Sequence, residues 1–340
     1  MERTIKKIIF AARNTVACTS EKANIDPPAN GALVETRYSC ISAGTELAKL
    51  TGKQSFPYPA GIGNRAIGRV IAAGSACSRV KSGDLVFAHA AHASVAATDG
   101  LVVRLPDELD QPETALIGMA SVAMTGVRVA RPEIGDRAVV LGAGPVGQLA
   151  AQLLALDGAR VIMIDPVKER LGVARRCGIL HVIDSSEGDA AERVLDLTDG
   201  EGAEHILDCT GLQSVIVSAP PMARKGGQIV LVGSPRGEYQ TDVTDFLNAF
   251  HLDRAHGDLT LRGAHEWKIP IYPVAGLKHS QERNVQTIVQ LICEKRLKLS
   301  PLLSKTFSPD DAQAAYDALA QSPSAILGAV FDWSGISGSV

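Results

Sequence analysis

The sequence lacks the features that mark several large classes of protein. Its six cysteines lie far apart in 340 residues without a Cys-x-x-Cys pair, so it offers neither a disulfide framework nor a zinc knot. No apolar run approaches the roughly 20 residues that a membrane helix needs. An excess of one charge is also lacking, because 34 Lys and Arg against 37 Asp and Glu give −3. This balance favours neither nucleic acid nor an anionic bilayer as a partner.

These absences fit a soluble protein with reduced, buried thiols, and we expect it to be cytoplasmic. Residues 1–20 carry Ile8, Ile9 and Phe10 after two lysines, but Arg13 interrupts the apolar stretch. The stretch is too short for the core of a signal peptide, so we predict a first β-strand there.

The length of the sequence and the change in its residue pattern along the chain predict two domains, at roughly 150 residues per domain. Up to about residue 110, short β-prone runs such as 33–38, 68–71 and 84–87 alternate with Gly, Pro and Ser, which predicts a β-rich unit. From Gln111, Ala-rich helical windows alternate with apolar strands, which predicts a parallel sheet covered by helices. These strands are expected at 138–141, 161–164, 205–207 and 228–232. After about Pro273 the pattern predicts four further segments: a helix over 281–295, a segment over 302–307, a helix opening at Ser308 and a strand over 325–332.

The strongest motif follows the strand at 139–141. There the chain reads Gly-x-Gly-x-x-Gly, with Gly142, Gly144 and Gly147, and continues as an Ala/Leu helix through Leu156. In a dinucleotide site the first glycine allows a tight turn, the second lets the backbone approach a pyrophosphate, and the third lets helix and strand pack closely. The N–H groups and dipole of the helix N-terminus then attract the phosphates.

Asp165 ends the next strand, 23 positions after Gly142, where a carboxylate can accept hydrogen bonds from the ribose hydroxyls. A 2′-phosphate there would be repelled, so we predict NAD rather than NADP. Two alternatives stay open. Asp165 could instead cap the helix after Pro166, and Arg170 could bind a phosphate or pair with Asp165.

Together with the segments 165–171, 208–211, 226–227, 233 and 308–316, this motif resembles the medium-chain dehydrogenase/reductase superfamily. The resemblance covers nearly the whole chain. It implies a GroES-like catalytic domain over 1–125 and 275–340, a Rossmann domain over 126–274, an active site in the cleft and a homodimer. The predicted cofactor-binding residues are Gly142, Gly144, Pro145, Val146, Gly147, Asp165, Arg170, Thr210 and Gly233.

Zinc-dependent members of this superfamily hold a catalytic metal with three motifs, and the matching positions here are changed. A Cys-Gly-(Ser/Thr)-Asp motif corresponds to 43–46, which reads Ala-Gly-Thr-Glu; a His-Glu pair corresponds to Asn64 and Arg65; and a third Cys or acid corresponds to Gly118. Ala and Gly offer no donor atom, and Asn beside a cationic Arg is a poor zinc ligand. The four-cysteine structural lobe is absent as well. We therefore expect no zinc.

Without a metal, side chains must stabilise or deprotonate the oxygen of the reacting carbon. Our first candidate acid/base is Lys49, one turn after Thr45, unless it is an ordinary solvated lysine. Asn64 and Arg65 take the place of the His-Glu pair, and Arg65 could hold a substrate oxygen or merely pair with Glu46. Thr45 occupies the position of the superfamily's proton-relay hydroxyl, or is a turn residue.

Histidines supply further candidates. His89 and His92 are more readily explained as structural residues, but His92 is the better candidate for contact with substrate. A histidine-rich stretch over 251–268 suits hydroxyl-rich ligands, a subunit contact or a surface loop equally well.

The leading hypothesis is a zinc-independent, NAD-dependent oxidoreductase that acts on a secondary alcohol or ketone of a sugar or polyol. The segment 115–128 is similar to sorbitol dehydrogenases, and shorter segments to bacterial sugar or glycoside dehydrogenases. Two alternatives stay open: an enoyl or quinone reductase, which would use NADPH, and a nucleotide-binding protein without catalysis.

Overall fold

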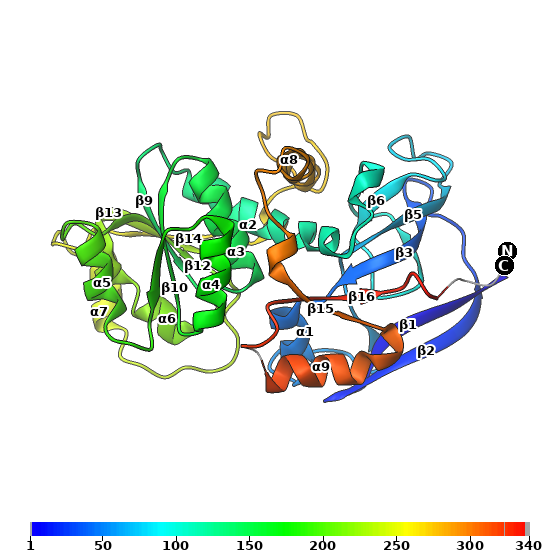
Figure 1. Ribbon diagram of the computed structural model, residues 1–340, viewed down its shortest axis with the longest axis horizontal. Helices are drawn as coiled ribbons and strands as arrows, with labels where there is room; N and C mark the ends of the chain where they lie inside the picture. Colours follow the sequence, from blue (N-terminus) through cyan, green and yellow to red (C-terminus); the bar gives the residue numbers. More distant parts are fainter. Residues whose placement is uncertain (1, 323, 337–340) are drawn as a thin grey trace. The chain divides into compact units, whose positions relative to one another are not determined.

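A computed structural model describes residues 2–322 and 324–336 of the chain (Figure 1). The chain divides into two compact units. The β-rich unit comprises Met1–Gly118, Ile269–Gln290 and Leu303–Val340, and the α/β unit comprises Met119–Lys268 and Leu291–Leu302. In the part of the chain that the structure describes, no helix has both the length and the apolar character needed to cross a bilayer.

Two sheets form the β-rich unit. A three-stranded sheet has the order β2-β1-β4, and a seven-stranded sheet has the order β15-β16-β3-β5-β6-β8, with β7 paired to β3. Their bounds are β1 Glu2–Ala12, β2 Thr15–Asn24, β3 Ala32–Cys40, β4 Ala60–Gly61, β5 Ala66–Ala73, β6 Leu85–Ala88, β7 Val95–Thr98, β8 Val102–Arg104, β15 Leu303–Phe307 and β16 Gly328–Asp332. The longer helices are α1 Ala43–Leu50, α8 Gln281–Cys293 and α9 Ala312–Gln321.

The core of the β-rich unit lies between these sheets and α9. Helix α9 buries Ala312, Ala315, Tyr316 and Leu319, whose spacing places them on one helical face. This face packs in one cluster with residues of β1 and β16, among them Phe10 and Phe331. Ser308 caps the short turn before α9, since its side chain accepts a hydrogen bond from Asp310 N.

The α/β unit contains a parallel six-stranded sheet. Its strand order is β11-β10-β9-β12-β13-β14, so the chain runs outwards from β9 to β11 and then restarts beside β9 at β12. Ligands of such sheets bind at the carboxyl ends of the strands, where the order reverses. The strands are β9 Arg137–Leu141, β10 Arg160–Asp165, β11 His181–Asp184, β12 Ala203–Asp208, β13 Ala223–Leu231 and β14 Thr260–Gly263.

Helices flank this sheet (Figure 1). They are α3 Pro145–Leu156, α4 Lys168–Cys177, α5 Ala190–Leu197, α6 Gln213–Val217 and α7 Thr244–His251, while α2 Ile117–Ala130 begins at the end of the β-rich unit and continues into this one. Short 3-10 turns occur at Asp107–Leu109, Pro112–Leu116, Pro220–Met222, Glu266–Lys268, Ser300–Leu302 and Pro309–Asp311. The predicted fold class, a β-rich unit with a Rossmann-like parallel sheet, is confirmed.

The division of the chain differs from the predicted domain ranges in two respects. It falls at Gly118 and Lys268 rather than near 125 and 274, and Leu291–Leu302 belongs to the α/β unit rather than to the catalytic domain. Hydrogen bonds explain the second difference. The Gln152 side chain accepts from Lys298 N at 2.8 Å and donates to Lys298 O at 3.2 Å. The Lys298 ammonium also donates to Arg176 O.

Candidate functional site

The turn between β9 and α3 needs two of its glycines for packing. Gly142 has φ +92°, and a Cβ there would lie 2.7 Å from Thr210 Cγ2. A Cβ on Gly147 would overlap the carbonyl oxygen of Gly142. The absence of side chains at Gly142 and Gly147 therefore lets α3 pack closely on β9, as the motif predicted.

Gly144 differs, because a Cβ there would meet no atom within 4 Å. Gly144 is the N-cap of α3, offers no side-chain cap, and is followed by Pro145 at the first helical position. The N–H groups of Val146 and Gly147 belong to the first turn, which has no intrahelical acceptors for them. An open, uncapped N-terminus on a helix of 12 residues fits a pyrophosphate.

Asp165 lies beside this turn and is 5% exposed. Its Oδ2 accepts a hydrogen bond from Ala143 N at 2.7 Å, and its Oδ1 accepts one from Val167 N at 2.9 Å. Arg170 Nη1 lies 3.9 Å from Oδ2. The carboxylate thus ties the glycine-rich turn to Val167, the N-cap of α4, but Asp165 is not itself the cap of that helix. Each carboxylate oxygen retains acceptor capacity for a ribose hydroxyl.

The loops that follow β12 and β13 also belong to the predicted cofactor site. Asp208 is fully buried and accepts hydrogen bonds from Thr210 N, the Thr210 hydroxyl and Gly211 N. Burial raises the pKa of the Asp208 carboxyl even though these bonds oppose the rise. A Cβ on Gly233 would overlap the Gly211 backbone, so the two loops touch at glycines.

The structure thus brings the predicted cofactor residues together at the carboxyl ends of β9, β10, β12 and β13, where the strand order reverses. Sequence reasoning left Asp208 and Gly211 out of the predicted set. Both stand in the segment 208–211, so the signal was present in the sequence.

In the β-rich unit, Arg65 is 5% exposed and extends past Gly118. A Cβ on Gly118 would lie 2.6 Å from Arg65 Nε and 2.7 Å from its Cγ. Arg65 Nη1 also donates to Asn64 Oδ1 at 2.9 Å, and Asn64 is exposed. Three of the positions that correspond to metal ligands are therefore adjacent.

These residues do not fit a zinc ion. Ala43 and Gly118 offer no side-chain donor, and the cationic Arg65 occupies the space next to Gly118. Within residues 2–322 and 324–336, no group of three or more His, Cys, Asp or Glu side chains could hold a metal. Burial raises the pKa of the nearby Cys40 thiol to about 12, so this thiol stays protonated at neutral pH.

Helix α1 carries Thr45 and Lys49, as predicted. Both are half-buried. The Lys49 ammonium lies 5.5 Å from the centroid of the Phe56 ring, a cation–π distance. Tyr58 donates its hydroxyl hydrogen to the Lys49 carbonyl.

The predicted contact of His92 with substrate needs correction. His92 has no exposed surface, and its ring nitrogens lie 2.7 Å from Ser39 Oγ and 3.2 Å from Glu46 Oε2. It therefore has the features of a structural histidine. Glu46 in turn bonds with Ser42, His92 and Tyr316 rather than pairing with Arg65.

The histidine-rich stretch does not gather around one site. His256 lies with Nδ1 at 2.6 Å from Ala223 O, whereas His251 and His265 are exposed.

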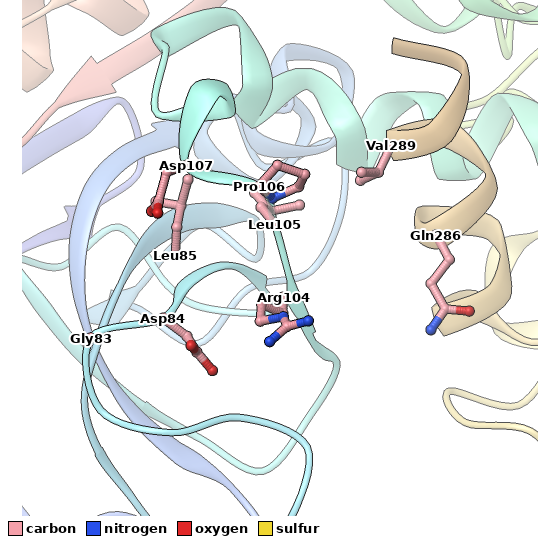
Figure 2. Close-up of a pocket in the computed structure, with 9 residues that line it drawn as sticks. All are labelled: Gly83, Asp84, Leu85, Arg104, Leu105, Pro106, Asp107, Gln286 and Val289. Atoms are coloured by element: carbon pink, nitrogen blue, oxygen red, sulfur yellow. The ribbon is translucent and has the colours of Figure 1, made fainter. Parts of the chain in front are cut away.

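A separate hollow of about 500 Å³ lies in the β-rich unit, between β6, β8 and α8 (Figure 2). Leu85, Leu105, Pro106 and Val289 form its apolar lining, and Arg104 and Gln286 extend into the space between the strands and the helix. None of the predicted site residues lines it.

Comparison with known proteins finds dehydrogenases and a reductase. The family model described as zinc-binding dehydrogenase matches residues 145–268. A D-xylulose reductase of Saccharomyces cerevisiae is 26% identical over 227 residues, which cover 65% of this chain and 58% of the relative. Sorbitol dehydrogenase 1 of the same yeast is 26% identical over 306 residues, 78% of this chain and 80% of that protein.

A solved structure from Sinorhizobium meliloti 1021, described as a zinc-binding dehydrogenase bound to NADP, has a TM-score of 0.80 at 18% identity and covers 97% of this chain and 99% of its own. The matches and the fold support a place in the medium-chain dehydrogenase/reductase superfamily. Of the segments that resemble the superfamily, 142–147 lies at the turn after β9, the first strand of the parallel sheet along the chain. The segments 43–46, 63–65 and 118 lie in the β-rich unit.

Proposed function

We propose that the chain is a zinc-independent, NAD-dependent oxidoreductase that transfers a hydride between nicotinamide and a secondary alcohol or ketone of a sugar or polyol. The observation that carries the proposal is the open N-terminus of α3 at Gly144, placed where the strand order of the parallel sheet reverses. The names of the relatives, a D-xylulose reductase and a sorbitol dehydrogenase, support the substrate class.

For the cofactor, the α3 N-terminus would bind the pyrophosphate, and Asp165 with Arg170 would flank the adenosine ribose. The carboxylate favours ribose hydroxyls over a 2′-phosphate, although its bonds to Ala143 and Val167 leave it less available than an open acceptor. Bound nicotinamide would supply or accept the hydride.

For the reacting oxygen, the chain offers polar side chains rather than metal ligands. Arg65 presents a guanidinium with several N–H donors, and Asn64 and Thr45 supply an amide and a hydroxyl. We assign oxygen binding to Arg65, Asn64 and Thr45, and proton transfer to Lys49. A guanidinium near a developing alkoxide stabilises its charge, which is the work a metal performs elsewhere.

The experiment is a screen of polyols, sugars and their ketones with NAD and NADP, in both directions, followed by absorbance of the reduced nicotinamide. We expect turnover of a hydroxyl-rich substrate with NAD. Tight NAD binding without turnover of any alcohol or ketone would refute the activity.

An enoyl or quinone reductase is the second candidate. The internal hydrogen bonds of Asp165 favour it to a degree, because they weaken the argument against NADPH. Titration with NADH and NADPH separates the two candidates, since tighter binding of NADPH and reduction of a conjugated C=C bond would support the second. A homodimer and a cytoplasmic location stay predictions.

A further inference from the structure

Five polar side chains form a continuous chain of hydrogen bonds inside the β-rich unit, and the proposed function leaves them without a role. Trp333 Nε1 lies 2.8 Å from Ser39 Oγ, which lies 2.7 Å from His92 Nδ1. His92 Nε2 lies 3.2 Å from Glu46 Oε2, and the Tyr316 hydroxyl lies 2.6 Å from the same oxygen. All five residues are at most 2% exposed.

The arrangement resembles a Ser-His-Glu relay, but burial excludes nucleophilic attack by Ser39, because no substrate could reach it. Ser39 Oγ also already accepts the hydrogen of Trp333. The side chains are therefore available for a structural task only.

Trp333 and Glu46, at the two ends of this hydrogen-bond network, fix the direction of its hydrogen bonds. Trp333 can only donate, and an ionised Glu46 can only accept. The consistent assignment is that Trp333 donates to Ser39, Ser39 to His92 Nδ1, and His92 Nε2–H to Glu46. In this assignment Nε2 of His92 carries a hydrogen.

Glu46 is the carboxylic acid of this network. Burial opposes its ionisation, but His92, Tyr316 and Ser42 N–H outweigh burial and hold the pKa of the Glu46 carboxyl below its usual value. A buried carboxylate with three donors is a rigid junction, because losing any donor leaves charge unsatisfied.

This junction connects two segments that carry proposed active-site residues. Glu46 lies in α1 directly after Thr45. His92 N donates to Ile62 O at 2.8 Å, and its ring covers Gly63, where a Cβ would lie 2.6 Å from the ring. Asn64 and Arg65 follow Gly63 at once.

We propose that Glu46, His92 and Ser39 are positioning residues, which hold Thr45 on α1 in register with Asn64 and Arg65. Helix α9 supplies the third support through Tyr316. The expected effect on catalysis rests on the proposed function. The positioning of α1 relative to residues 63–65 does not depend on it.

The first test is Glu46→Gln. A glutamine amide has one acceptor oxygen, so its NH₂ group must face either Ser42 N–H or the donors of His92 and Tyr316, and donor meets donor in both orientations. We expect α1 to move relative to residues 63–65 in the crystal structure of the variant. The matched double variant Glu46→Gln/Tyr316→Phe removes one conflicting donor and should restore part of the geometry.

Ring ¹⁵N shifts of His92, assigned with His92→Asn, report the tautomer without any assay of activity. An Nδ1–H tautomer or a cationic His92 in the wild type at pH 7 would overturn the assigned direction. If Glu46→Gln does not fold, Ser39→Ala replaces it. This variant removes the donor to His92 Nδ1 and the acceptor of Trp333 Nε1–H, and a shift of the turn at 63–65 is again expected.

Kinetics supply the catalytic readout. Misplacement of the oxygen-binding residues should lower kcat about 10- to 100-fold while NADH affinity is unchanged, because the proposed nucleotide residues belong to the α/β unit. If residues 43–50 and 63–65 superpose in wild type and variant, the positioning role is wrong. If the wild type turns over no substrate, the proposed function fails while the structural comparison still decides the positioning role.

Discussion

At the scale of the residue, neighbouring glycines of one motif have different tasks. Gly142 and Gly147 are needed for packing, whereas Gly144 leaves room in front of the α3 N-terminus. Since the Cβ of a residue at 144 meets no atom, substitution there should affect ligand binding without affecting the fold.

We therefore expect Gly144→Val to abolish NADH binding with little change in Tm. Isothermal titration calorimetry and thermal unfolding measure the two effects. Unchanged NADH affinity would contradict the assignment of the site.

Glu46 gives a pH dependence of stability. Its pKa is lowered in the folded state, so the unfolded state binds more protons in acid. The stabilisation is complete above the unfolded pKa of about 4.3 and is lost as pH falls through the lowered folded pKa.

We expect Tyr316→Phe, which removes one donor to this carboxylate, to reduce the free energy of unfolding by about 1.5–3 kcal/mol at pH 7. The difference from wild type should shrink as the pH falls below 4. Urea unfolding at pH 7 and in acid measures it, and an equal difference at both pH values would contradict the role of the charge.

At the scale of the element, Gly147 of α3 is needed for close approach to the backbone before that helix, whereas Gly172 of α4 faces open space. A Cβ on Gly147 would overlap the backbone of Gly142, but a Cβ on Gly172 in α4 would have only Arg176 Nη1 within 4 Å, at 3.8 Å. Two glycines in neighbouring helices thus form a matched pair.

Gly147→Ala should destabilise the protein by about 1–3 kcal/mol, as overpacking does. Gly172→Ala should stabilise it by about 0.5–1 kcal/mol, because alanine favours the helix. Denaturant unfolding compares the two variants. Equal effects would show that the overlap at 147 is relieved without cost.

At the scale of the whole molecule, the ligand positions of the zinc-dependent pattern hold Ala43, Asn64, Arg65 and Gly118. The Arg65 side chain stands against Gly118, so the space is occupied by a cation of the protein itself. The proposal of zinc independence follows from this donor set.

We expect incubation with a strong chelator to leave turnover unchanged. Elemental analysis of the purified protein should find zinc well below one ion per chain. Stoichiometric zinc, or activity lost on chelation and regained with zinc, would overturn the proposal.

Local sequence patterns predicted four strands of the parallel sheet and the turn before α3, but not the edge strands β11 and β14. The alternation of strands and helices and the glycine spacing at 142–147 involve residues close together in the sequence. A short window of sequence is therefore enough to predict them. The sequence also led to the proposal that the metal-ligand positions of the zinc-dependent pattern hold other residues. The association of Leu291–Leu302 with the α/β unit depends on bonds between Gln152 and Lys298, which no local pattern reveals.

The surroundings of His92 and Glu46 depend on contacts between segments that are distant in the chain. Glu46 meets His92 across 46 residues and Tyr316 across 270. Whether a histidine is open to substrate or satisfied in a core depends on what folding packs around it. Arg65 is a similar case, because its path past Gly118 follows from side-chain packing between segments distant in the chain.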